Sequence, residues 1–179
     1  HLERARDMFI IGCKTGLRYS DIYSIQAHNI EGDLIRLKTY KGVVKATIPI
    51  FKETRSILLK YNYELPRKIS NQKLNEYVKE VGELAGLNNL ERKSIVRATG
   101  EDVKFVPKYQ LVSSHTARRS FCTNMYNDNV SIISICAITG HKTETEFLKY
   151  LKVDKSDHAL RVLKMINELE STKPMYANG

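Results

Sequence analysis

The sequence carries a small set of basic and phenolic residues whose chemistry suits a phosphate group. They are Arg18, Lys41, His115, Arg118, His141 and Tyr150. Guanidinium, ammonium and imidazole groups bind the oxygens of a phosphate, and a phenol can act as a nucleophile. These residue types together indicate binding or transfer of a phosphate.

One of the motifs is H-x-x-R, formed by His115 and Arg118. The three-residue spacing places both side chains on one face of a helix start, where the helix dipole adds positive charge. Taken alone, the motif is more typical of a solvated helix start. Likewise, His141 after Gly140 alone is typical of a surface histidine, and Tyr150 alone is typical of helix packing. The functional prediction therefore depends on all of these residues occurring in order.

Other catalytic classes lack their motifs in this sequence. There is no paired acidic motif at strand ends, no H-E-x-x-H and no Cys/His cluster with ligand spacing, so a metal-dependent nuclease is not expected. There is no G-x-x-x-x-G-K-[ST] loop, so ATP use is not expected either. Cys13, Cys122 and Cys136 are odd in number and far apart, which predicts buried, reduced thiols of a cytosolic protein.

Length and charge indicate a single basic domain. The chain has 179 residues and a net charge of +9, and domains typically have roughly 100–200 residues. Such a charge favours a polyanionic partner, most often nucleic acid. No run approaches the roughly 18 apolar residues of a membrane span. Because the sequence begins at His1 and not at Met, we expect it to be a fragment of a longer chain.

Hydrophobic periodicity predicts a mainly helical α+β chain. Helices are expected at residues 2–13, 22–26, 52–61, 71–85, 116–126, 131–138, 144–151 and 157–169. Ser20-Asp21 is expected to cap the helix at 22–26, Ser131 the helix at 131–138 and Thr143 the helix at 144–151. Ser113 or Ser114 is expected to cap the helix at 116–126.

Two β-hairpins are also expected. Strands at 34–37 and 43–50 flank a Lys41-Gly42 turn. A second small hairpin is predicted from strands at 95–98 and 103–106, in a stretch that is rich in basic residues. These are Arg92, Lys93, Arg97, Lys104 and Lys108.

The order of the motifs resembles the catalytic domain of the tyrosine recombinases, the class of lambda integrase. That family has an arginine in a T-G-L-R turn, a hairpin lysine, H-x-x-R, G-H and a tyrosine about nine residues further on. The sequence contains these motifs in the same order as Thr15-Gly16-Leu17-Arg18, Lys41, His115-Thr116-Ala117-Arg118, Gly140-His141 and Tyr150. The strings TGLRYSDI, SSHTARRSF and ITGHKTETEFLKYLK resemble integrases of mobile elements such as conjugative transposons.

The resemblance implies a domain organisation. A tyrosine recombinase catalytic domain is expected over residues 1–172, α+β and mainly helical, with a small antiparallel sheet or β-hairpin and a C-terminal helical half. Residues 173–179 are expected to form a flexible tail. The N-terminal core-binding domain of the family is absent from this sequence, and the role of the stretch at 90–112 is left open.

The resemblance also implies a mechanism. Tyr150 would attack the scissile phosphate and become linked to the 3′ end of the DNA, while Arg18 and Arg118 would stabilise the charge on the phosphate oxygens. Since a free phenol has a pKa of about 10, the nucleophile needs a base, for which His115 is the candidate. His141 would hydrogen-bond the phosphate.

Lys41 would protonate the departing 5′ oxygen, although Lys38 and Lys45 of the same hairpin stay open as alternatives. No metal, cofactor or ATP is implied. Further basic residues are expected to position the DNA backbone. These are Arg36, Lys45, Arg119 and Lys142.

The expected partner is double-stranded DNA. By resemblance, the protein would be a monomer in isolation and a homotetramer on DNA during synapsis, in the bacterial cytoplasm at the nucleoid, with no membrane association. Two alternatives stay open: a catalytically inactive DNA-binding relative, and a DNA-relaxing enzyme of the type IB topoisomerase kind. The last helix, at 157–169, is expected to pack either on its own domain or on a neighbouring protomer.

Overall fold

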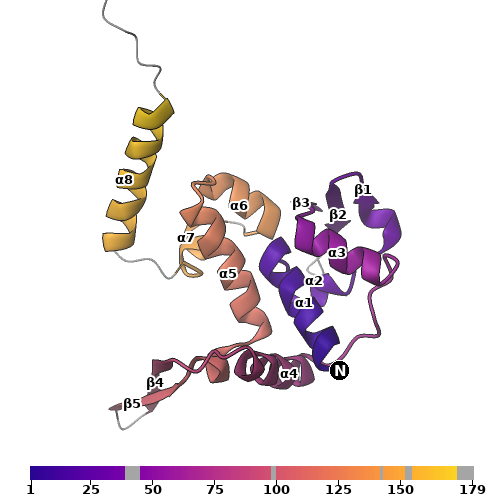
Figure 1. Cartoon of the computed structure of the whole chain (residues 1–179), viewed down its shortest axis with the longest axis horizontal. Helices are drawn as coiled ribbons and strands as arrows, with labels where there is room; N and C mark the ends of the chain where they lie inside the picture. Colours follow the sequence, from indigo (N-terminus) through magenta and orange to yellow (C-terminus); the bar gives the residue numbers. More distant parts are fainter. Residues whose placement is uncertain (39–44, 98–99, 142, 152–154, 173–179) are drawn as a thin grey trace, which may run out of the picture.

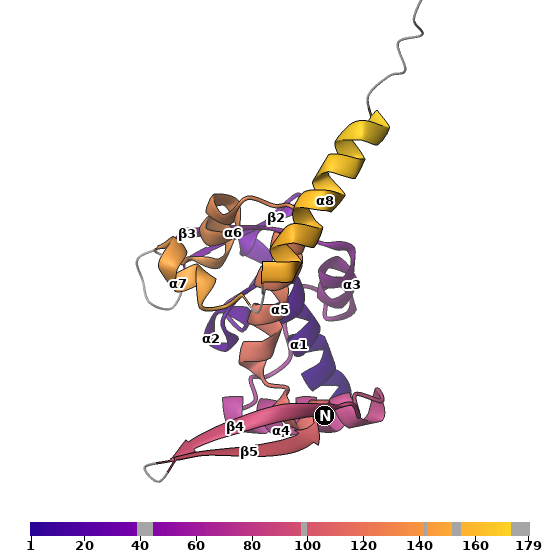
Figure 2. The same cartoon turned by 90° about the vertical axis from the view of Figure 1, so that its left-hand side faces the viewer.

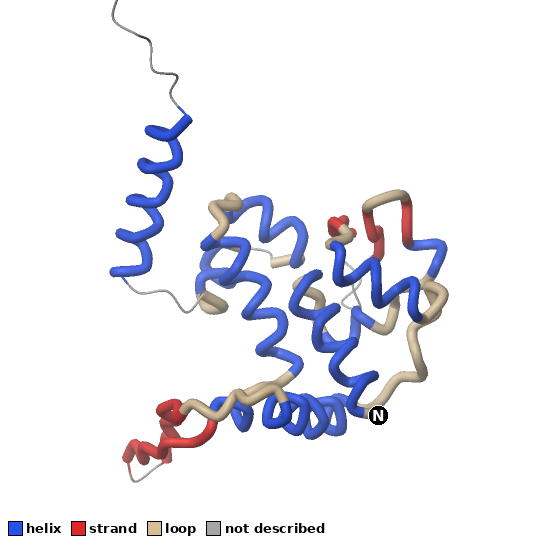
Figure 3. Tube along the Cα trace, viewed as in Figure 1, coloured by secondary structure: helices blue, strands red, loops and turns tan. Residues whose placement is uncertain are grey.

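The computed structural model describes residues 1–38, 45–97, 100–141, 143–151 and 155–172. Helices make up most of the described chain, with short strands in two separate places (Figure 3). The predicted roles of Lys41 and Lys142 and the predicted tail at 173–179 lie outside the described residues.

The first helix is the centre of the domain. α1 (Leu2–Thr15) buries an apolar stripe at Ala5, Met8 and Ile11. It packs against α3 (Lys52–Lys60), α4 (Asn71–Leu84) and α5 (Ser114–Asn127) (Figure 1). α1 ends at Gly16, whose φ of 66° is a left-handed conformation that favours glycine.

A three-stranded antiparallel sheet covers part of the core. Its strands, in the order β1-β2-β3, are β1 (Ile30–Glu31), β2 (Leu34–Lys38) and β3 (Lys45–Pro49). Ile35 pairs with Ile48 on the buried face. The predicted hairpin is confirmed as β2–β3, and β1 is an additional strand that the sequence pattern did not indicate.

The short helix after α1 differs from its prediction. α2 (Tyr19–Ile22) begins directly after Arg18, so Arg18 is its N-cap, and the prediction of a helix at 22–26 capped by Ser20-Asp21 is wrong. Ile22 and Ile25 are both buried, which explains the helix-like spacing. A turn, followed by the 3-10 helix η1 (Ala27–Asn29), carries the chain onward instead.

The second hairpin is longer than predicted. β4 (Leu90–Arg97) and β5 (Gly100–Pro107) pair along their whole length, and together they extend away from α4 (Figure 1). Phe105 is 67% exposed, so this sheet adds little to the core. The 3-10 helix η2 (Lys108–Leu111) leads back from β5 and packs on α4.

The C-terminal half is helical, as predicted. α5 is followed by α6 (Ile132–Thr139), α7 (Glu144–Leu148) and α8 (Lys155–Thr172). The predicted caps are confirmed: the side chains of Ser113, Ser131 and Thr143 each accept a backbone N–H from the first turn of the helix that follows. α7 is shorter than predicted, because its helix ends at Leu148, and α8 stands away from the body (Figures 1 and 2).

Two clusters of buried side chains hold the chain together. The larger joins α1, the three-stranded sheet, α3 and α4, and the smaller joins α5, α6 and α7 around Phe121, Ile135 and Phe147. All three cysteines are free thiols, Cys122 buried and the other two half-buried. No helix in the described part of the chain has the length and apolar content to cross a membrane.

Candidate active site

Arg118 is the most buried member of the predicted set. It lies in the first turns of α5, is 1% exposed, and is among the largest fully buried side chains. Its Nη1 donates a hydrogen bond to the carbonyl oxygen of Gly16 at 2.7 Å, and its Nη2 lies 3.0 Å from Nε2 of His141. A guanidinium has five N–H groups, so these two bonds leave three. One of them, Nε–H, is buried and has no acceptor within the described residues.

The Gly16 carbonyl, which accepts the hydrogen bond from Arg118, belongs to the turn that ends α1. Thr15 is buried, donates its hydroxyl to the Ile11 carbonyl at 2.7 Å and accepts from the Leu17 amide at 3.3 Å. A side chain at Gly16 would collide with Phe121 of α5, since an added Cβ would lie 2.5 Å from its ring. Glycine is therefore required at Gly16 both by its positive φ and by the close approach of α5.

His141 follows α6 and faces the other end of the Arg118 guanidinium. It is 8% exposed, and its Nδ1 lies 2.6 Å from Oγ1 of Thr139. Burial, together with the positive charges of Arg118 and Arg18, lowers the pKa of His141 to about 4. The ring is therefore neutral at neutral pH.

Tyr150 lies against these groups, in the turn that follows α7 and not on the helix itself. Its ring centroid is 4.6 Å from that of His141 and 5.1 Å from that of His115, and Cζ of Arg118 is 5.4 Å from the centroid. The backbone N–H of Tyr150 donates to the carbonyl of Phe147 at 2.8 Å, which holds the turn on the buried end of α7.

His115 and Arg18 form the exposed edge of the site. His115 is exposed as a whole residue, but neighbouring protein atoms shield part of its ring from solvent. This partial burial, together with the positive charges of Arg119, Arg118 and Arg18, lowers the pKa of His115 below the ordinary value. It is therefore unprotonated at neutral pH and able to accept a proton. Arg18 is half-buried and lines a small cavity of about 270 Å³ together with His115 and Arg118.

The described structure thus brings five of the six predicted residues together. Arg18 and the Gly16 carbonyl come from the end of α1, and the others come from α5, the end of α6 and the turn after α7. The sixth residue, Lys41, lies outside the described residues, between β2 and β3. Of the two alternatives to it, Lys38 is exposed at the end of β2.

The residues predicted to position DNA are in different situations. Arg36 is exposed on the outer face of β2, where it forms an ion pair with Glu31 at 2.8 Å. Arg119 donates from Nη2 to the carbonyl of Lys149 at 3.4 Å, so it contacts the turn that carries Tyr150. Lys45 begins β3, and Lys142 lies outside the described residues.

Two parts of the site were not predicted from the sequence. Thr139 contacts His141, and the buried Asp21 raises the pKa of Arg118 by its charge, against the larger lowering by burial. Their only sequence signal is that they lie within the strings ITGH and TGLRYSD.

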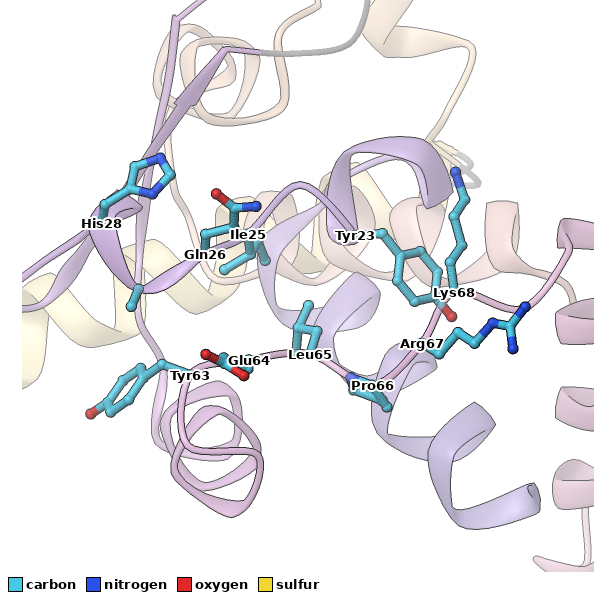
Figure 4. A pocket seen from close by; sticks show the side chains of 11 residues that line it. Tyr23, Ile25, Gln26, His28, Tyr63, Glu64, Leu65, Pro66, Arg67 and Lys68 are labelled. Atoms are coloured by element: carbon cyan, nitrogen blue, oxygen red, sulfur yellow. The ribbon is translucent and has the colours of Figure 1, made fainter.

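A larger cavity, of about 590 Å³, lies away from these residues, between η1 and the segment that joins α3 to α4 (Figure 4). It is lined by Ile25, Tyr63 and Leu65, among others, and by none of the predicted site residues. Within the described residues, no three His, Cys, Asp or Glu side chains converge as metal ligands.

Comparison with known proteins identifies the family to which the chain belongs. Residues 2–157 match the model of the phage integrase family. The chain belongs to the phage integrase family. A comparison with curated proteins finds no match to this chain.

Solved structures of recombinases have the same fold as this integrase-family domain. XerA recombinase superposes with a TM-score of 0.62 at 14% identity, over 97% of this chain and 64% of that chain. XerH site-specific recombinase, bound to palindromic difH substrate in a post-cleavage complex, superposes with a TM-score of 0.63 at 17% identity. The match covers 90% of this chain and 46% of the XerH chain. The Tn1549 transposon integrase, in complex with transposon right end DNA, superposes with a TM-score of 0.59 at 15% identity. The match covers 92% of this chain and 59% of the integrase chain.

These likenesses confirm the predicted fold class, the tyrosine recombinase catalytic-domain fold. The chain spans 64% and 46% of the length of the XerA and XerH chains, so it corresponds to part of each of those proteins.

Proposed function

We propose that this domain cleaves and rejoins DNA strands in site-specific recombination through a 3′-phosphotyrosine intermediate, without metal or ATP. The observation that carries the proposal is the position of Tyr150, whose ring contacts two neutral histidines and a guanidinium. Structural neighbours bound to DNA, and family membership, support double-stranded DNA as the partner and the nucleoid of a bacterial cytoplasm as the place of action.

In the proposed cleavage step, Oη of Tyr150 attacks the scissile phosphorus and the bond from phosphorus to the 5′ oxygen breaks. His115 accepts the phenolic proton, which its lowered pKa allows. Arg18 and the free N–H groups of Arg118 bind the phosphate oxygens as their charge grows. The 3′-phosphotyrosine keeps the energy of the broken bond, so a 5′ hydroxyl of a partner strand can reverse the step.

The departing 5′ oxygen also needs a proton. We assign this role to Lys41, with Lys38 and Lys45 as the alternatives on the same hairpin. A lysine ammonium group can supply this proton, and protonation of an alkoxide by a positioned acid is worth roughly 10²–10⁴ in rate.

Recombination, in contrast to DNA relaxation by a topoisomerase, needs an assembly of protomers. Two contacts in the first turns of α8 join it to the end of α5 and the turn that follows: His158 meets the hydroxyl of Tyr126 at 3.0 Å, and Arg161 donates to Asn129 at 2.8 Å. Its apolar residues stay exposed, with Leu160 at 64% and Leu163 at 53%. An exposed apolar helix favours docking on a second copy over a monomeric enzyme, and supports a homotetramer on DNA.

The experiment is a covalent trap. The protein is incubated, in excess chelator, with a pool of sequence-randomised duplexes that carry a nick close to the scissile position, so that the short cleaved strand diffuses away. We expect DNA-linked protein that resists detergent, with the linkage at the 3′ end of the DNA. DNA that is bound but never linked would contradict the proposal. Cleavage without linkage that stops in chelator and returns with magnesium would indicate a metal nuclease.

A further inference from the structure

We propose that Thr139 is a positioning residue that fixes the tautomer of His141 and, through it, the orientation of the Arg118 guanidinium. The inference deepens the proposed function and depends on it only for the activity measured below. It is carried by a chain of hydrogen bonds that runs from α6 to the phosphate-binding arginine.

The first step is the hydroxyl of Thr139, which lies in the last turn of α6 and is 2% exposed. Its Oγ1 is 2.7 Å from the carbonyl oxygen of Ile135, one helical turn earlier. A carbonyl oxygen only accepts, and a hydroxyl has a single hydrogen. Thr139 therefore donates its hydrogen to Ile135.

The second step is the contact between Thr139 and His141, whose Nδ1 lies 2.6 Å from the same Oγ1. Because the hydroxyl hydrogen is used, this oxygen acts as the acceptor and Nδ1 of the ring must carry a proton. In a neutral imidazole, the other nitrogen then has a lone pair and can only accept.

The third step is the contact of Nε2 with Nη2 of Arg118 at 3.0 Å. Arginine is a donor only, so Nε2 must accept. The opposite tautomer would place an N–H of His141 against an N–H of Arg118, and a doubly protonated ring would add a like charge. All three contacts are satisfied together only in the tautomer that Thr139 selects. In this tautomer both ring nitrogens are used, so on this proposal His141 holds Arg118 and does not itself donate to the phosphate, as the resemblance had implied.

The local backbone makes this geometry possible. Gly140, between the two residues, has a φ of 71°, and the amides of Gly140 and His141 both donate to the carbonyl of Cys136, at 2.8 and 3.2 Å. This turn brings the side chains at 139 and 141 together. The guanidinium of Arg118 is consequently held at one end by the Gly16 carbonyl and at the other by His141.

Removal of the hydroxyl leaves no satisfactory state for the ring. In Thr139→Val, Nδ1–H keeps no acceptor, while the other tautomer opposes Arg118. We expect His141 to populate both tautomers and Arg118 to lose its hydrogen bond to His141, which is one of the two bonds that orient the guanidinium. Thr139→Ser keeps the hydroxyl and should retain both.

The first measurement needs no DNA. Two-dimensional ¹⁵N–¹H spectra of the imidazoles in the labelled protein distinguish the two tautomers. We expect His141 to be protonated at Nδ1 in the wild type and in Thr139→Ser, and to show a mixed or reversed tautomer in Thr139→Val. A wild-type His141 protonated at Nε2 overturns the proposal, and so does an unchanged tautomer in Thr139→Val.

The second measurement is the rate of covalent linkage to nicked DNA. Thr139→Val should react roughly 10–100-fold more slowly, the loss that follows when the orienting partner of a ligating imidazole is removed at metal centres, with unchanged DNA affinity. Thr139→Ser should restore the rate, and a Thr139→Val rate equal to wild type overturns the proposal.

The matched control is Thr54→Val. Thr54 is as buried as Thr139, but its hydroxyl meets no partner in the described part of the chain. The same substitution there should leave both the spectrum and the rate unchanged. If Thr139→Val does not fold, Thr139→Ala replaces it. If the wild type forms no linkage at all, the proposed function fails, while the imidazole spectra still decide the role of Thr139.

Discussion

The two sides of the site differ in how their side chains are held. On the buried side, Arg118, His141 and Thr139 are at most 8% exposed and are joined to one another and to the Gly16 carbonyl by hydrogen bonds. On the open side, His115 is exposed and Tyr150 is half-buried, and both rings contact their neighbours through their faces and edges.

On the proposed function, this difference suits the two sides to separate tasks. Donors that are fixed before the substrate arrives need no reorganisation when charge develops, so the buried side suits stabilisation of a phosphate. Groups that attack or transfer protons must move relative to the phosphate, so the open side suits the reacting residues. On the proposed function, substitutions on the open side should remove a chemical step, and substitutions on the buried side should slow it.

The largest effect is expected from Tyr150→Phe on the open side. Without the phenolic oxygen no covalent linkage to DNA can form, whereas the ring and its contacts remain, so DNA binding should be unchanged. Electrophoresis of nicked duplexes before and after detergent measures both quantities. Tyr109→Phe is the control and should form the linkage at the wild-type rate. Linkage that persists in Tyr150→Phe would contradict the assignment.

A second test concerns Lys41, the proposed acid, which lies outside the described residues. If it is the acid, Lys41→Ala should cleave ordinary DNA about 10²–10⁴-fold more slowly. A substrate with sulfur in place of the bridging 5′ oxygen has a leaving group that needs no proton, so it should largely restore the rate of Lys41→Ala but not that of Arg118→Ala. Restoration in Lys38→Ala or Lys45→Ala, with Lys41→Ala like wild type, would place the acid on another lysine.

The two arginines sharpen the comparison. Arg118→Lys should lower the rate of linkage by about 10²–10³, because one ammonium cannot replace a planar guanidinium that spans the Gly16 carbonyl and His141. Arg18→Lys should lower the rate of linkage by a smaller factor. Arg18 lines the small cavity of the site, where we expect it to contribute mainly its positive charge, which lysine retains. Single-turnover rates and DNA affinities are to be compared. Equal losses in the two variants, or parallel losses of rate and affinity, would contradict the distinction.

The smallest effect is a pH dependence of stability. The pKa of His141 falls from an ordinary 6.5 to about 4 in the folded chain, so between these values the unfolded chain binds a proton that the folded chain does not. Stability should therefore fall as the pH drops from 6.5 to 4, by up to about 3 kcal/mol. His141→Asn should show a shallower fall in denaturant titrations over this window. Equal slopes would show that His141 is not held neutral by the buried side.

The residues that converge in the site could be predicted from the sequence on both sides, except Thr139, because they stand in short motifs that follow one another in the order of the tyrosine recombinase family. The spacing of His115 and Arg118 and the caps Ser131 and Thr143 are local features, and local hydrogen bonds decide them. The small antiparallel hairpin β2–β3 was predictable for the same reason, since its alternation sets its buried face.

The contacts of the buried side were harder to predict than its residues, because long-range packing decides those contacts. Arg118 bonds to a backbone carbonyl 102 residues away, which depends on the close approach of α5 to the end of α1. Thr139 gave no signal, since a threonine in the last turn of a helix is ordinary. The start of α2 was misplaced because Asp21, read as part of a cap, is instead a buried residue inside the helix.

The central claim, that Tyr150 forms the covalent bond to DNA, is tested most directly by mass spectrometry of the trapped wild-type complex. After digestion with trypsin and nuclease, the account predicts a nucleotide on the tripeptide Tyr150-Leu151-Lys152, which contains no other tyrosine. A nucleotide on a peptide that contains Tyr109 or Tyr126 instead would contradict it.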